Sequence, residues 1–404
     1  MYDENLFNKT TEKKGFRNGS SIGNILVLLI FITIIQQTPF ILANFYNEIR
    51  FLLYILFGIS SVLAGLNKES YREKTVKYMV YVTIYVTIIS IIPIIDSKSI
   101  SFEGTIELLV PLGILLCSKN TKYSSNKLSN IIKGYVFLAS LLGIYSIIYY
   151  DLGFIITQNY VVKSKNQIGP VIGISAIITM YNVVLNKKNS INNIRYKIFN
   201  NTLFVMLFLS LIIFRNRSSI LGVIIVGVFM LIKSNKMEIT YKKFLILNII
   251  GIFLLIIYAS GILKELTNFL WNSLTLNYNI NDLNSLSAGR TDGYLEALKI
   301  SIKNPLFGQL SNNISLEHQV HNYILNKWIK YGIFGSLPII AFYIYLWKIS
   351  LKGVFLNNKS NVVFYILLFS LIVSILEYTY PFGPGVSQIM LWFLLGQYLN
   401  SMEY

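Results

Sequence analysis

The fold is decided by long apolar stretches, of which the first, residues 22–44, reads IGNILVLLIFITIIQQTPFILAN and carries no charged side chain. About 20 apolar residues are enough for a helix to cross the hydrocarbon core of a membrane. Similar stretches recur near residues 48–66, 76–95, 104–118, 131–150, 167–186, 199–214, 218–233, 243–263, 333–347, 362–379 and 385–401. The pattern predicts an all-α polytopic membrane protein with about twelve transmembrane helices.

The composition excludes an ordinary soluble domain. Hydrophobic residues make up 54% and charged residues 13% of the 404 positions, a balance that is too apolar for such a domain. The net charge of +17 is distributed in small groups between apolar runs, not on one basic face, so we expect no nucleic-acid partner. The single cysteine, Cys117, excludes an intramolecular disulfide and a cysteine-based metal site.

The placement of lysine and arginine predicts how the chain crosses the cell membrane. Alternate connections between the apolar stretches are basic, and basic short loops stay in the cytoplasm. We therefore expect both termini in the cytoplasm and the active face outside it. The predicted parts are a cytoplasmic tail (residues 1–21), a membrane domain of about nine helices (22–263), an outer loop with amphipathic helices (264–332) and a membrane domain of about three helices (333–404).

Four cations lie on the outer side, where topology gives no reason for positive charge: Lys165, Arg215, Arg217 and Arg290. A guanidinium pairs well with phosphate oxygens, so these arginines suit a pyrophosphate at headgroup depth. For any one arginine alone, snorkelling to lipid headgroups is the simpler explanation. Lys165 and Asn166 open a predicted span, where they suit a sugar or phosphate ligand, and an ordinary helix start explains them equally well.

The outer loop contains both histidines, His318 and His321. A histidine side chain titrates near neutrality, so His321 is a candidate to accept a proton from a sugar hydroxyl; a histidine capping the next helix fits equally well. Glu317-His318-x-x-His321 does not have the His-Glu-x-x-His order of zinc proteases, and the chain has no third histidine. We therefore expect no metal and no cofactor.

The rest of the loop predicts a fold on the membrane surface. Residues 291–302 space apolar side chains as an amphipathic interfacial helix does, with Tyr294, Leu295, Leu298 and Ile302 on one face. Asn304-Pro305 ends this helix and Gly308 marks a turn. Residues 323–331, including Lys327, have the aromatic and basic composition of the headgroup zone.

Short motifs occur in a fixed order along the second half of the chain: Arg217-Ser218, Gly289-Arg290-x-Asp292, Asn304-Pro305-Leu306-x-Gly308, His321-Asn322-x-x-Leu325 and Gly332-Ile333-x-Gly335. In this order they resemble the O-antigen ligase and polymerase superfamily, and within it the polysaccharide polymerases that join lipid-linked repeat units. The chain departs from that family at Tyr294, where members often have tryptophan, and at Gln309, where a second glycine often follows Gly308.

The resemblance implies a metal-independent, inverting glycosyltransferase on a fold related to the GT-C enzymes, with polyprenyl pyrophosphate as leaving group. By position, Arg217, Arg290 and His321 are its catalytic residues, and Arg215, Lys165, Asn166 and Asn322 are substrate-binding candidates. The implied partners are a polyprenyl-pyrophosphate-linked oligosaccharide, membrane lipid and a chain-length regulator.

Two other functions remain open at this point. A ligase uses the same donor and a different acceptor, and nothing in the residues separates it from a polymerase. A transporter or flippase for lipid-linked glycans also has many helices, but transporters place ionisable groups at mid-membrane. Glu48, Asp151 and Glu377 lie near span ends here.

Overall fold

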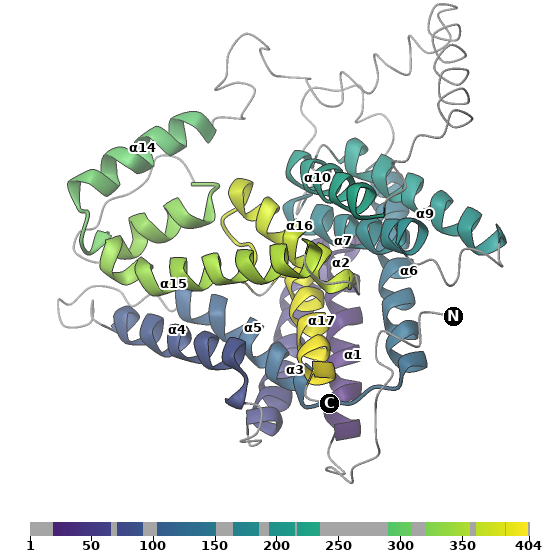
Figure 1. Ribbon diagram of the computed structural model, residues 1–404, viewed down its shortest axis with the longest axis horizontal. Helices are drawn as coiled ribbons and strands as arrows, with labels where there is room; N and C mark the ends of the chain where they lie inside the picture. Colours follow the sequence, from purple (N-terminus) through teal and green to yellow (C-terminus); the bar gives the residue numbers. More distant parts are fainter. Residues whose placement is uncertain are drawn as a thin grey trace, which may run out of the picture.

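The computed structural model describes residues 19–65, 71–91, 103–150, 165–185, 194–214, 216–234, 290–308, 320–355, 361–383 and 385–402. In this part of the chain every regular element is a helix and none is a strand (Figure 1). The helices are α1 (Gly19–Gln36), α2 (Pro39–Asn44), α3 (Tyr46–Gly65), α4 (Lys74–Ile91), α5 (Glu103–Lys119), α6 (Ser125–Tyr149), α7 (Lys165–Val184), α9 (Ile194–Ile213), α10 (Arg217–Lys233), α14 (Arg290–Lys303), α15 (Tyr323–Phe355), α16 (Val362–Leu376) and α17 (Val386–Met402).

The helices are those of a multi-pass membrane protein. Four of them, α4, α6, α7 and α15, are long and apolar enough to cross a membrane. Large apolar side chains point away from the protein, among them Val62, Tyr81 and Ile148, and a soluble surface rarely carries so many. The span expected over residues 243–263 and much of the outer loop lie outside the described residues.

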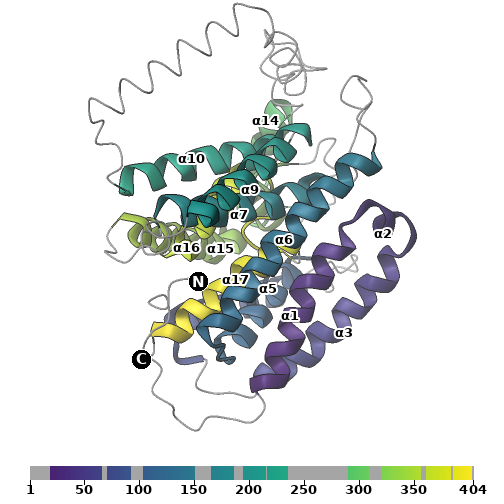
Figure 2. The same cartoon turned by 90° about the vertical axis from the view of Figure 1, so that its right-hand side faces the viewer.

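The first expected span, residues 22–44, is interrupted. Helix α1 ends at Gln36, and the short helix α2 begins at Pro39. Proline has no N–H to continue a helix and disfavours helical backbone at the preceding residue, and Thr38 is extended, with φ −65° and ψ 137°. Helix α2 joins α1 to α3, which lie side by side (Figure 2). The break therefore brings Gln37 and the start of α3 to the same end of this pair.

Helix α16 forms the centre of the molecule and packs against α7, α10, α15 and α17. Its residues 362–374 are all buried. Phe369 is in close contact with Gly173 of α7 and Gly222 of α10, since a Cβ at these glycines would lie 2.5 and 2.7 Å from its ring. Small residues allow such close approach between membrane helices. The end of α16 at Leu376 is thereby held in place by its neighbours.

Two of the sequence motifs meet in one backbone contact. The turn after α14 docks on α15 where that helix kinks at Gly332, and the amides of Ile333 and Phe334 donate to the carbonyls of Pro305 and Leu306 at 2.8 and 3.2 Å. Gly332 has φ 67°, and a Cβ there would lie 2.2 Å from the Leu306 oxygen. Only glycine adopts this conformation without strain. The docking folds α14 back along the first half of α15.

The amphipathic helix expected over residues 291–302 is α14, and Leu295, Leu298 and Ile302 of its apolar face are exposed, away from the protein. The opposite side, which packs on the protein, consists of the small residues Gly293, Ala297 and Ser301, which let α14 lie close to α15. One expectation needs correction. Lys327, expected in a surface run of headgroup-zone composition, is buried and forms an ion pair with Glu107 of α5.

Candidate functional site

Four segments meet at the carboxylate of Glu377. This residue follows the last turn of α16 in an extended conformation, and its side chain is only 6% exposed. Its Oε1 lies 2.9 Å from Nη2 of Arg290, which opens α14. Its Oε2 lies 3.5 Å from Nδ1 of His321, before α15, and accepts a hydrogen bond from Nδ2 of Asn166, in the first turn of α7, at 3.4 Å. The Glu377 cluster (Asn166, Arg290, His321 and Glu377) thus joins residues that are far apart in sequence.

Neighbouring side chains fix the backbone of His321. The Tyr294 hydroxyl donates to the His321 carbonyl at 2.9 Å. Asn322 caps α15 by accepting from the Leu325 amide at 3.0 Å, and its Nδ2 donates to the Ile375 carbonyl at 3.1 Å. Burial raises the pKa of the Tyr294 hydroxyl, an effect that Arg290 opposes and Glu377 reinforces. Tyr294 therefore stays a hydrogen-bond donor and ties α14 to His321.

The electrostatics of the cluster centre on a buried anion. Burying a carboxylate is costly unless positive groups and hydrogen bonds offset the lost hydration, and Arg290 and Asn166 provide both. The His321 ring faces the same carboxylate through Nδ1, which is buried and makes no hydrogen bond within the described residues. That orientation leaves Nε2 for another group. Arg290 and His321 are 21% and 25% exposed, so a ligand can reach both side chains.

Arg217 lies close to this cluster by backbone position. It follows Asn216, the N-cap of α10. Asn216 packs on Gly169 of α7, where a Cβ would lie 2.2 Å from the Asn216 amide carbon. Gly169 is about one helical turn from Asn166. The start of α10 therefore lies beside the start of α7, at the same end as Glu377.

The structure describes only some of the remaining candidate residues. Lys165 is the first residue of α7, but its side chain, Arg215 and His318 lie outside the described residues. Within the described residues, no group of three or more His, Cys, Asp or Glu side chains forms a metal-binding cluster.

Glu377 was not predicted as a site residue. In the sequence it is visible only as an acid near the end of a span. Its signal is that it directly follows the apolar helix α16 and has no basic neighbour in sequence. A carboxylate in that position needs a partner from elsewhere in the chain.

No protein-family model matches the chain, and no curated protein matches it.

Proposed function

We propose that this protein is a polysaccharide polymerase that transfers a glycan chain from polyprenyl pyrophosphate to a sugar hydroxyl of a second lipid-linked unit. The observation that carries the proposal is the meeting of Arg290 and His321 at Glu377. These two residues belong to the motifs that resemble the O-antigen ligase and polymerase superfamily. A partly exposed base and a guanidinium side by side are what a glycosyl transfer from a pyrophosphate needs.

His321 serves as the general base in this proposal. With Nδ1 facing Glu377, Nε2 accepts the proton of the attacking sugar hydroxyl. A carboxylate behind an imidazole holds the ring in one orientation and stabilises the imidazolium that forms. The 3.5 Å separation is longer than a hydrogen bond, and such contacts often tighten only when substrate is bound.

Arg290 and Arg217 act on the leaving group. The acceptor oxygen bonds to the anomeric carbon from the face opposite the phosphate, so the configuration inverts. The bond from that carbon to the phosphate oxygen breaks, and the polyprenyl pyrophosphate leaves with the electron pair. Arg290 offers the guanidinium nitrogens that do not contact Glu377, and fixed positive groups stabilise the charge that grows on the phosphate without a metal ion.

The proposal places the site at the outer face of a bundle of about twelve helices. Arg215 and Lys165 remain predicted substrate-binding residues. Asn166 and Asn322 use their described side-chain contacts to hold Glu377 and the end of α16, so we assign them to positioning the site.

A reconstituted assay tests the proposal. Full-length protein in liposomes is incubated with a lipid-linked repeat unit, and the products are separated by length. We expect a ladder of longer glycans from the wild type, no ladder from Glu377→Gln, and a normal ladder from Lys127→Gln. Lys127 is exposed, and its ammonium group contacts Asn24 near the start of α1. Lys127→Gln is therefore a control for the loss of a surface charge.

Two other results of this assay would each indicate a different function. One transfer to a supplied acceptor without a ladder would indicate a ligase. Movement of an unchanged glycan across the bilayer would indicate a transporter. Either result contradicts the polymerase proposal.

A further inference from the structure

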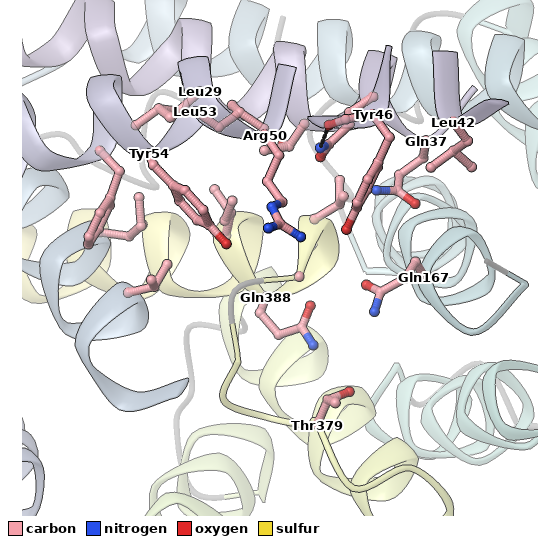
Figure 3. A pocket seen from close by; sticks show the side chains of 18 residues that line it. Leu29, Gln37, Leu42, Tyr46, Arg50, Leu53, Tyr54, Gln167, Thr379 and Gln388 are labelled. Carbon is pink, nitrogen blue, oxygen red and sulfur yellow. Dashed lines mark hydrogen bonds between the residues drawn. The ribbon is translucent and has the colours of Figure 1, made fainter. Parts of the chain in front are cut away.

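A second polar site adjoins the Glu377 cluster. A cavity of about 490 Å³ lies where α1, α2 and α3 face α5, the start of α7 and the start of α17 (Figure 3). Gln167, next to Asn166, and Thr379, two residues after Glu377, both line it. The cavity and the cluster therefore share two chain segments.

Arg50 of α3 points into this cavity, toward Gln388 (Figure 3). Its guanidinium carbon lies 5.6 Å from the ring centroid of Tyr46 and 5.7 Å from that of Tyr54. These contacts orient the side chain without neutralising its charge. Within the described residues no aspartate or glutamate lines the cavity, and Arg50 forms no ion pair. The cavity therefore holds a positive charge that an anionic ligand would neutralise.

Three glutamines surround the same space with unpaired polar atoms. The Oε1 atoms of Gln37 and Gln167 and Nε2 of Gln388 are buried without a hydrogen-bond partner in the described part of the chain. Gln37 and Gln388 are 6% and 1% exposed. Buried polar atoms are nearly always paired, and an amide without a partner can turn its nitrogen or its oxygen to a ligand. Together with Arg50 they supply the donors that a phosphate needs.

The deeper wall of the cavity is apolar. Leu53, Phe57, Val110 and Ile114 line it, and Phe57 is two turns from Arg50, about 10 Å along the helix. Tyr46, Arg50 and Tyr54 are exposed, so the cavity opens on the outer surface of α3. A ligand with a phosphate at one end and a hydrocarbon chain at the other matches this order of polar and apolar walls.

We propose that the cavity binds the prenyl diphosphate end of the lipid-linked glycan, an identity that rests on the proposed function. The phosphate that carries the prenyl chain contacts Arg50 and the amides of Gln167 and Gln388, and the first isoprene units lie along Leu53 and Phe57. The sugar-bound phosphate extends past Gln167 and Thr379 to the Glu377 cluster, where Arg290 and Arg217 contact it and its bond to the sugar breaks. Arg50 is thus a substrate-binding residue outside the motifs found in the sequence.

Binding of farnesyl diphosphate to the purified full-length protein tests this site. We expect Arg50→Gln to weaken binding about tenfold or more, because a charge-assisted contact is lost, and Arg50→Lys to weaken it less. Phe57→Ala should weaken binding of farnesyl diphosphate but not of inorganic pyrophosphate. Gly385→Ala keeps every charge and places a methyl 2.2 Å from Oε1 of Gln388 and 2.8 Å from Oε1 of Gln167, so it should also weaken binding. Lys127→Gln is the control and should bind as the wild type does.

Equal affinity of wild type and Arg50→Gln would overturn the proposal. Displacement of farnesyl diphosphate by phosphatidylglycerol at equal concentration would also overturn it, because the cavity would then be a general phospholipid site. The result of this binding experiment can be distinguished from the result of the polymerase assay. Arg50-dependent binding without any ladder refutes the polymerase and keeps the cavity, whereas a ladder with Arg50-independent binding refutes the cavity and keeps the polymerase.

Discussion

Two carboxylates, Glu107 and Glu377, pair with cations around α15, and the two pairs differ in how exposed the cation is. Glu107 pairs with Lys327, whose side chain is 3% exposed and whose ammonium also lies 5.0 Å from the centroid of the Tyr323 ring. Glu377 pairs with Arg290 and faces His321, which are 21% and 25% exposed. The first pair is closed and holds α5 against α15. The second pair leaves Arg290 and His321 within reach of a ligand. We therefore assign Glu377 to the reaction site and Glu107 to a structural role.

The largest expected effect is on catalysis at the open pair. Removing a general base typically costs about 10² to 10⁴ in rate, so His321→Ala should reduce the ladder to background while the protein still inserts in the membrane and binds lipid-linked donor. His318→Ala is the matched control and should be much milder. Normal polymerisation by His321→Ala at normal expression would show that another group activates the acceptor, or that none is needed.

Breaking the closed pair, Glu107 with Lys327, should lower the stability of the protein. Lys327→Ala leaves the largely buried Glu107 carboxylate without its cation, and breaking a buried pair in this way costs about 3–5 kcal/mol. Unfolding followed in mild detergent should show this loss, and the double variant Lys327→Met with Glu107→Leu should recover most of it. A Lys327→Ala protein that is fully stable but inactive would reverse the assignment of the two pairs.

The next largest effect should come from disturbing the backbone contact that holds α14, and with it Arg290, against α15. Gly332→Ala forces a side chain into φ 67° and against the Leu306 carbonyl, and strain of this kind costs about 1–3 kcal/mol. We expect a lower melting temperature and a slower polymerase. Gly58→Ala is the control, since a Cβ there has no atom within 4 Å. Equal stability of the two variants would mean that α14 is held by other contacts.

Part of the fold was predictable because long apolar runs form helices. The apolar run expected over residues 48–66 is α3, and the run expected over 76–95 is α4. The interruption of the first span was missed because a window of mean hydropathy does not register the effect of Pro39 on the backbone. The packing face of α14 was missed for a related reason: glycine, alanine and serine carry little hydrophobic signal, yet they allow the closest approach.

The candidate site was predictable only in part. Arg290 and His321 were visible as polar residues in one loop, and their proximity follows from the folding of α14 along α15. Asn166 was predicted to bind substrate at the same site, whereas Glu377 was not linked to it, because the contacts of Glu377 depend on how α16 and α7 pack, which no local pattern encodes. Arg50 was not among the candidate residues, and only the cavity shows that its charge lacks an ion-pair partner within the described residues.

A smaller effect is expected from Arg290→Lys. An ammonium keeps the charge next to Glu377 but lacks the planar fork that holds two phosphate oxygens at once, so turnover should fall about tenfold, the size of one lost charge-assisted hydrogen bond. Arg290→Ala should lose more and should also destabilise the protein, because Glu377 would stay buried beside an empty position. If Arg290→Lys polymerises at the wild-type rate, Arg290 acts only as the counter-ion of Glu377, and the open pair is as structural as the closed one.

The smallest expected effect is that of removing divalent metal ions. The Arg290 guanidinium lies 2.9 Å from Oε1 of Glu377, in the place where a cation bound to this carboxylate would have to sit, and His321 faces the other oxygen. With the positive charge already supplied by arginine, EDTA should leave the rate of ladder formation unchanged. Loss of activity with rescue by one divalent ion would mean that a metal carries the charge on the leaving phosphate. The same titration on Arg290→Ala sharpens the comparison, because rescue of that variant alone would show that a cation beside Glu377 is what the reaction requires and that arginine is the one the protein uses.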